Sequence, residues 1–101
     1  MSKVTMIGTM TCQDGKNEAI EAMFADMVEA SKEEPGCEIY SYLRGEGNDY
    51  HFFALMAGPD AMQAHGQSDA MQQAMTPMGD VLAGPPQMMV THPVAANGFN
   101  L

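Results

Sequence analysis

The chain has 101 residues, of which 46% are apolar and 17% are charged. That length suits one hydrophobic core, so we expect a single domain over residues 1–101, with residues 93–101 as a C-terminal tail. Thirteen acidic residues against four Lys and Arg give a net charge of −9. Such a charge repels phosphate backbones and anionic lipids, so the composition predicts neither nucleic-acid nor membrane-surface binding.

Neither a targeting signal nor a metal-binding pattern is recognisable. The first residues lack the apolar run of a signal peptide, and no stretch approaches the roughly 18 apolar residues of a membrane span. Cys12 and Cys37 show no CxxC or Cys/His spacing, so we interpret them as reduced thiols of a cytoplasmic protein. Methionine occurs twelve times. Four of these residues lie at helical spacing and two at strand spacing, which favours core and pocket lining over copper coordination by thioethers; they are Met62, Met71, Met75 and Met78, and Met6 and Met10.

Residues 3–12 form the first predicted element, a strand. Polar and apolar residues alternate there with period two, and β-branched side chains are frequent. The following segment predicts a helix with Asp14 as its N-cap, because acidic residues occupy one side and apolar residues recur at helical spacing on the other. The apolar stripe consists of Ile20, Met23, Phe24, Met27 and Val28.

A Glu-Pro-Gly-Cys motif at residues 34–37 separates this helix from a second predicted strand, 37–43. Pro35 disfavours helical backbone in the residue before it, and Gly36 permits the turn. A hairpin loop then leads to a third strand, 50–56, which is apolar on both faces. Because such a strand must be covered on both sides, we expect the open sheet face to pack against a second copy of the chain, giving a homodimer.

The second half of the chain predicts a helical region over residues 61–83 with two interruptions. Gly66 ends the first piece, Ser68 caps the second, and Pro77 starts a third short piece. The last strand is expected at 87–92. The order β-α-β-β-α-β predicts a ferredoxin-like α+β sandwich with two helices on one face of a four-stranded antiparallel sheet.

Two segments make the chain resemble the antibiotic biosynthesis monooxygenase (ABM) family. Residues 14–42 match its Gly-Lys turn, amphipathic helix, Glu-Pro-Gly-Cys break and Tyr-bearing strand, and "GPDAMQAHGQSDAM" matches its second helix, where His65 is followed three residues later by Ser68. The resemblance implies a dimeric α+β barrel with a pocket between the sheet and helices of each subunit. It also implies a cofactor-independent monooxygenase that oxidises a small phenolic or quinol-type substrate with molecular oxygen.

The sequence departs from the family pattern on its third strand. Many family enzymes carry Glu and Trp two residues apart where this chain has Ala54 and Met56. The haem-degrading branch places an axial His where this chain has Met75. Two alternatives to a monooxygenase therefore stay open, namely a non-catalytic homologue that binds a small ligand and an isomerase-type member.

His65 and Tyr40 are the candidate catalytic residues. An imidazole can accept a proton from a substrate hydroxyl, and a phenol can orient or protonate a substrate oxygen. Both have a competing structural interpretation, His65 at a helix end and Tyr40 in core packing. Tyr42, His51 and His92 are assigned to packing or strand ends. The expected binding site for a small apolar or aromatic molecule, for which ordinary core is again the alternative, consists of Phe52, Met56, Met71 and Met75.

Overall fold

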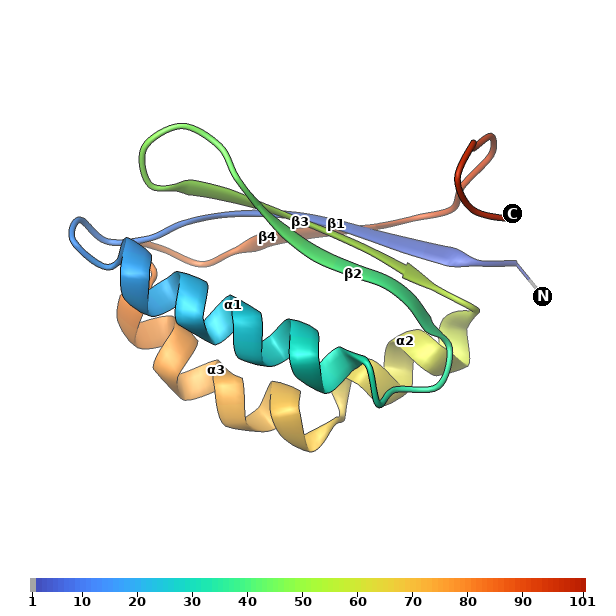
Figure 1. Ribbon diagram of the computed structural model, residues 1–101, viewed down its shortest axis with the longest axis horizontal. Coiled ribbons are helices and arrows are strands. Elements are labelled where there is room, and N and C mark those ends of the chain that lie inside the picture. The colour runs from blue at the N-terminus through green and yellow to red at the C-terminus, as the bar shows by residue number, and fades with distance from the viewer. Residues whose placement is uncertain (1) are drawn as a thin grey trace.

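A computed structural model describes residues 2–101, which fold into two layers (Figure 1). One layer is a four-stranded antiparallel sheet with strand order β2-β3-β1-β4. The helices form the other layer and all lie on the same face of the sheet. The elements are β1 (Val4–Thr11), α1 (Asn17–Ser31), β2 (Cys37–Arg44), β3 (Asp49–Met56), α2 (Pro59–Gly66), α3 (Asp69–Val81) and β4 (Gln87–Thr91). The predicted α+β class and antiparallel sheet are confirmed.

The core lies between the helices and the central strands. The helix-facing side of β3 is fully or almost fully buried, because every second residue of the strand points toward the helices. Ile20 and Phe24 of α1 cover one end of this face. Val81, the last residue of α3, and Leu82, the residue after it, belong to the same cluster. Burial of these apolar faces is the main term that stabilises the two-layer arrangement. The buried residues of β3 are Tyr50, Phe52, Ala54, Leu55 and Met56.

The start of α1 differs from the expected one. The helix begins at Asn17, after Lys16, and no side chain caps it. Asp14 lies in the preceding turn instead, where its carboxylate accepts a hydrogen bond of 2.6 Å from Asn48 Nδ2 in the loop between β2 and β3. The prediction of Asp14 as N-cap is therefore wrong, because a tertiary partner holds that carboxylate away from the helix end.

The predicted break between α2 and α3 is present, but the predicted third helical piece is not. Gly66 ends α2, and Ser68 caps α3 by accepting a hydrogen bond of 3.2 Å from the backbone N–H of Met71. The helix α3 continues through Pro77 to Val81, so the prediction of a restart at Pro77 is wrong. Proline removes one helical hydrogen bond, but the apolar side of α3 stays packed on both sides of it.

The Glu-Pro-Gly-Cys segment is a tight junction between β2, β3 and α2. Gly36 has φ +86, a left-handed conformation that favours glycine, and a Cβ there would lie only 2.8 Å from the Cβ of Ala61 in α2. Its carbonyl oxygen accepts a hydrogen bond of 2.7 Å from the N–H of Ala57, just after β3. Glycine is thus required both by the turn and by the close approach of α2.

The sheet face opposite the helices is only partly covered. Ile7, Leu43 and Met89 point away from the helices and are 44%, 52% and 62% exposed. After β4 the chain curls back over this face (Figure 1), where the ring of Phe99 lies 6.5 Å from that of Phe53, measured between centroids. Within residues 2–101 no helix combines the length and hydrophobicity needed to cross a bilayer.

Candidate functional site

A cavity of about 380 Å³ lies between α3 and the helix-facing side of the sheet. Among the residues that the structure describes, Tyr42 of β2 contributes the cavity's only polar side chain; the rest of the wall is apolar or glycine. Both edge strands, β2 and β4, and the central strand β1 contribute residues to the cavity wall. The lining residues are Met10, Met27, Tyr42, Met71, Ala74, Met75, Met78, Gly79, Leu82, Pro86 and Met88.

Tyr42 is fixed by an aromatic cluster and by a second phenol. Its ring stacks on Phe24 of α1 at 4.0 Å between centroids with an interplanar angle of 7°. Its hydroxyl lies 2.8 Å from the hydroxyl of Tyr40, and either can donate. Burial raises the pKa of both phenols above their ordinary value, and the neighbouring Tyr42 raises that of Tyr40 further. Both side chains therefore remain neutral near pH 7.

His65 lies behind Tyr40 and is paired with an acid. The two rings are 5.0 Å apart between centroids, and His65 is only 3% exposed. Its Nδ1 lies 2.8 Å from Glu34 Oε1. In a neutral imidazole whose Nδ1–H donates to this carboxylate, the lone pair is on Nε2. Nε2 is buried and has no hydrogen-bond partner within residues 2–101. The pair thus has the chemistry of an oriented base.

The structure brings some of the expected site residues together and separates others. Met71 and Met75 lie on the cavity wall. Phe52 and Met56 do not line it; they are 3% and 0% exposed in the cluster packed under β1 and β3. His65 and Tyr40 also lie outside the wall, and Tyr40 is connected to the cavity through Tyr42.

Two residues of this arrangement were missed by reasoning from the sequence. Tyr42 was assigned to packing, although its spacing of two from Tyr40 places both phenols on one strand face. Glu34 was considered only as the residue before Pro35, and no local pattern links it to His65. Its role depends on the turn that brings the end of α1 next to α2.

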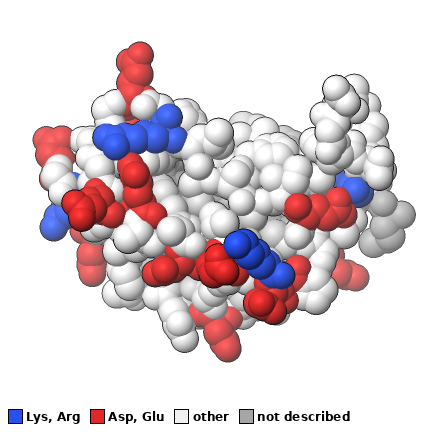
Figure 2. All heavy atoms as spheres, in the orientation of Figure 1, with Lys and Arg blue, Asp and Glu red and all other residues white. Residues whose placement is uncertain are grey.

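The four Lys and Arg leave the surface strongly acidic. Lys3, Lys32 and Arg44 each pair with a carboxylate, at 2.7, 2.9 and 3.0 Å. Figure 2 shows these few basic groups beside acidic ones, with further acidic side chains spread over the helical layer. The field of such a surface disfavours anionic ligands and tolerates neutral or cationic ones.

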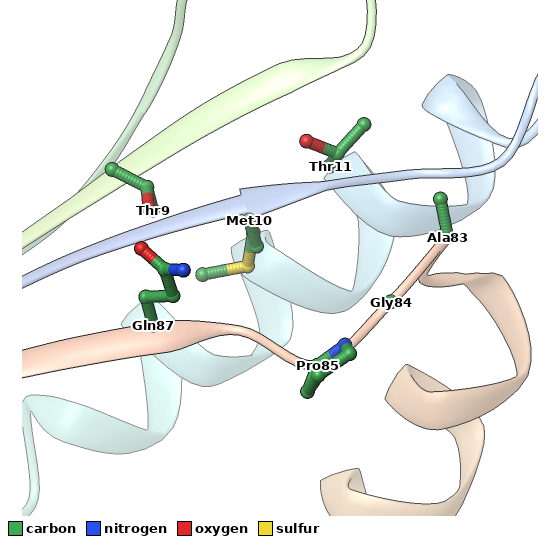
Figure 3. A pocket seen from close by; sticks show the side chains of 7 residues that line it. All are labelled: Thr9, Met10, Thr11, Ala83, Gly84, Pro85 and Gln87. Carbon is green, nitrogen blue, oxygen red and sulfur yellow. The ribbon is translucent and has the colours of Figure 1, made fainter.

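A second hollow, of about 400 Å³, lies where β1 meets the connection from α3 to β4 (Figure 3). Its polar groups are the hydroxyls of Thr9 and Thr11 and the amide of Gln87, all on exposed residues. The Thr11 hydroxyl donates a hydrogen bond of 2.9 Å to Asp49 Oδ1, and none of these three polar groups is buried. The apolar cavity with Tyr42 is the better candidate site.

Thiol or metal chemistry finds little support in the geometry. Burial raises the pKa of the Cys37 thiol, and the nearby carboxylate of Glu34 raises it further, so the group remains a neutral thiol. Cys12 is buried. Within residues 2–101 no three His, Cys, Asp or Glu side chains converge.

Comparisons with known proteins agree with this architecture. A solved structure from Caulobacter crescentus, assigned to the antibiotic biosynthesis monooxygenases, is 29% identical and has a TM-score of 0.88, covering 93% of this chain and 92% of that one. A protein from Mycobacterium tuberculosis is 21% identical with a TM-score of 0.86, over 94% of this chain and 98% of that one, which shows the shared fold alone.

Sequence relatives give the same answer at the level of the family. An uncharacterised protein from Synechocystis is 26% identical over 89 residues, which are 86% of this chain but only 60% of that protein. This chain therefore spans about three fifths of the length of that curated relative. Residues 3–77 match the family model described as antibiotic biosynthesis monooxygenase. The chain belongs to the antibiotic biosynthesis monooxygenase family.

Proposed function

We propose that this protein binds a small, uncharged phenol or quinol in the cavity under α3 and oxidises it with molecular oxygen, without a cofactor. The observation that carries the proposal is the position of Tyr42. It lines the apolar cavity and its hydroxyl is 2.8 Å from that of Tyr40, which packs against the His65–Glu34 pair. Membership of a monooxygenase family supports the same reaction class.

The cavity wall favours a flat or flexible apolar ligand. Methionine side chains are unbranched and polarisable, so they adapt to different ring shapes and make favourable contacts with aromatic faces. A volume of about 380 Å³ is at the small end for ligand sites. With the acidic surface disfavouring anions, a neutral aromatic molecule with one hydroxyl group fits best.

A phenol can react with oxygen once it has lost its proton, because the phenolate ring is electron-rich. We consider a polycyclic phenol with a free C–H opposite the hydroxyl. The carbon that bears the hydroxyl and the carbon that bears this hydrogen both become carbonyl carbons. One oxygen atom forms the new carbonyl, and the other leaves as water with the two displaced hydrogens. The substrate supplies all four electrons, and the protein contributes deprotonation and a dry, oriented site.

The proposed proton path ends at His65. The substrate hydroxyl would donate to Tyr42, whose hydroxyl shares a hydrogen bond with Tyr40. Raised pKa values keep both phenols neutral, so they suit a relay and not the base itself. The imidazole, oriented by Glu34, is the proposed terminal acceptor. Within residues 2–101 its Nε2 has no hydrogen bond to Tyr40, so the last transfer requires a bridging water or a movement of the Tyr40 hydroxyl toward Nε2.

A non-catalytic small-ligand binder is the second candidate. It is favoured by the enclosure of His65, which is 3% exposed, and by the fully buried Ala54 and Met56, where many family enzymes carry Glu and Trp. An isomerase would use the same base without oxygen. All three candidates share the cavity and differ in what happens to its occupant.

Oxygen uptake separates these candidates. Purified protein is incubated with neutral naphthols, anthrols and quinols while dissolved oxygen and product are followed. Variants are Tyr42→Phe, which keeps the ring that stacks on Phe24, and His65→Ala with His65→Gln as a second choice if alanine impairs folding. His51→Ala is the matched control, because that imidazole is exposed on β3, on the face away from the helices.

A monooxygenase should consume one oxygen molecule per phenol, and the Tyr42 and His65 variants should lose about 10²–10⁴-fold in kcat, as expected for an acid–base group. The His51 variant should match the unmodified protein. Full turnover in both His65 variants would remove His65 from the mechanism. Binding with no uptake identifies the non-catalytic binder, and conversion without uptake identifies the isomerase.

We also propose that the partly covered sheet face forms a homodimer. Ile7, Leu43 and Met89 are exposed apolar residues on this face, and exposed apolar area on one sheet face is typical of an interface between copies. The helices and the cavity under α3 lie on the opposite side, so the dimer would leave the ligand site accessible.

A further inference from the structure

Methionines dominate the wall of the candidate ligand cavity, and two of them are exposed residues. Met75 of α3 and Met88 of β4 are 61% and 54% exposed, although both belong to the wall. Met27 of α1, on the same wall, is only 5% exposed. The six lining methionines are Met10, Met27, Met71, Met75, Met78 and Met88.

The side chain of Met88 folds over the helix-facing side of the sheet. It pairs with Gly8 of β1, and a Cβ on Gly8 would collide with the Met88 sulfur, so that sulfur occupies the space the glycine leaves free. Met75 approaches the cavity from α3. Two exposed methionines therefore belong to opposite walls, Met75 on the helix and Met88 on the sheet.

We propose that Met75 and Met88 are peroxide-sensitive sites whose oxidation prevents the cavity from holding its apolar ligand. In the reaction a sulfur lone pair attacks hydrogen peroxide, the O–O bond breaks, one oxygen forms the sulfoxide and the other leaves as water. The sulfur loses two electrons and the peroxide gains them. Reductase enzymes that act on methionine sulfoxide reverse the change.

Oxidation at these positions would change the cavity from apolar to polar. A sulfoxide oxygen is a strong hydrogen-bond acceptor, and among the described residues that line the cavity only Tyr42 has a hydroxyl. A bound apolar ligand would bury this oxygen without a partner, which is unfavourable. The inference rests on the proposed ligand cavity, but not on monooxygenation.

The neighbouring Met89 provides a matched comparison. In the single chain it is 62% exposed, like Met75, but it points to the other face of the sheet, the face proposed to pair in a dimer, and does not line the cavity. Oxidation of Met89 alone should therefore leave ligand binding unchanged. Because Met89 is exposed but does not contact the cavity, it separates the effect of a sulfoxide in the cavity wall from general oxidative damage.

The test uses N-phenyl-1-naphthylamine, a neutral apolar fluorescent probe, on the full chain before and after graded hydrogen peroxide. Peptide mass spectrometry locates the sulfoxides, and circular dichroism checks that the fold persists. Oxidation at Met75 and Met88 should precede that at Met27 and weaken probe binding about tenfold or more. The Met75→Leu/Met88→Leu double variant should keep its affinity after peroxide, whereas Met89→Leu should lose it like the unmodified protein.

Several results would overturn the inference. They are unchanged binding with both residues oxidised, equal loss in the double leucine variant, loss that accompanies unfolding, or oxidation of Met27 at the same rate as Met75. Each of these leaves the proposed function standing if the untreated protein binds the probe. Failure of the untreated protein to bind would refute the ligand cavity, and the switch and the proposed function would fall together.

Discussion

The hydrogen bond between Tyr40 and Tyr42 can be measured by removing each hydroxyl separately and then both. Tyr42→Phe removes a bond of 2.8 Å and leaves the half-buried Tyr40 hydroxyl without its partner. A lost bond of this kind is worth about 1 kcal/mol, and an abandoned buried hydroxyl adds to it, so we expect about 1–2 kcal/mol of destabilisation from either single change. The Phe24 ring contact survives in both.

The double variant should be much less destabilised than the sum of the two. With neither hydroxyl present no polar group is left unpaired, so the loss should stay near that of one single change, which corresponds to a coupling of about 1–2 kcal/mol. Urea unfolding of the four proteins gives the free energies. In a domain of this size each 1 kcal/mol also lowers the Tm by roughly 4–8 °C.

Additive effects would refute this account of the site. They would mean that each hydroxyl bonds to water in the native state, and a relay from the cavity toward His65 would lose its first link. Oxygen uptake on the same proteins connects the two measurements. If the Tyr40 and Tyr42 changes are coupled in stability but the variants oxidise substrate as fast as the unmodified protein, the hydrogen bond is structural and has no part in catalysis.

Three further predictions concern the turn, the phenols and the outer sheet face. Gly36→Ala should destabilise the fold by about 2–3 kcal/mol in urea unfolding, because φ is +86 there and the new Cβ would meet Ala61; an unchanged midpoint would contradict that backbone conformation. Burial raises the pKa of all three tyrosines, so their contribution to stability is complete below pH ~10 and is lost as pH rises above it. A pH titration should show phenolate absorbance appearing only together with unfolding. Phenolate absorbance that appears near pH ~10 while the protein is still folded would disprove this. Ile7→Glu combined with Phe53→Glu should convert a dimer to monomer in sedimentation experiments, and a monomeric parent protein would reject the interface.

Most of the fold could be predicted because its signals are local. Alternation along β1 and the helical stripe containing Ile20 depend only on the spacing of apolar residues. The same holds for Gly66 and Ser68, which end one helix and cap the next. Pro77 shows the limit, since whether a proline breaks a helix depends on the packing of the residues around it, and that packing is tertiary.

The site was less predictable because its contacts join distant parts of the chain. Glu34 reaches His65 across 31 positions, and only the folded turn at Gly36 brings them together. Phe52 and Met56 are large apolar residues, as are Met71 and Met75, so the sequence does not distinguish the two pairs. The first two are packed in the core, while the others border a cavity. Apolar patterning identifies what is buried but not where the packing leaves a space.

The pairing of β1 with β4 determines when the cavity can exist during synthesis. Gly8 and Met88 are partners in the sheet, so the β4 wall is missing until residues 87–91 have been synthesised and have paired with β1. Contacts of such long range form slowly, and the apolar side of α3 meets water in the meantime. A ligand that needs this wall recognises only the completed fold. It therefore stabilises the four-stranded fold over any form in which β4 is not yet paired.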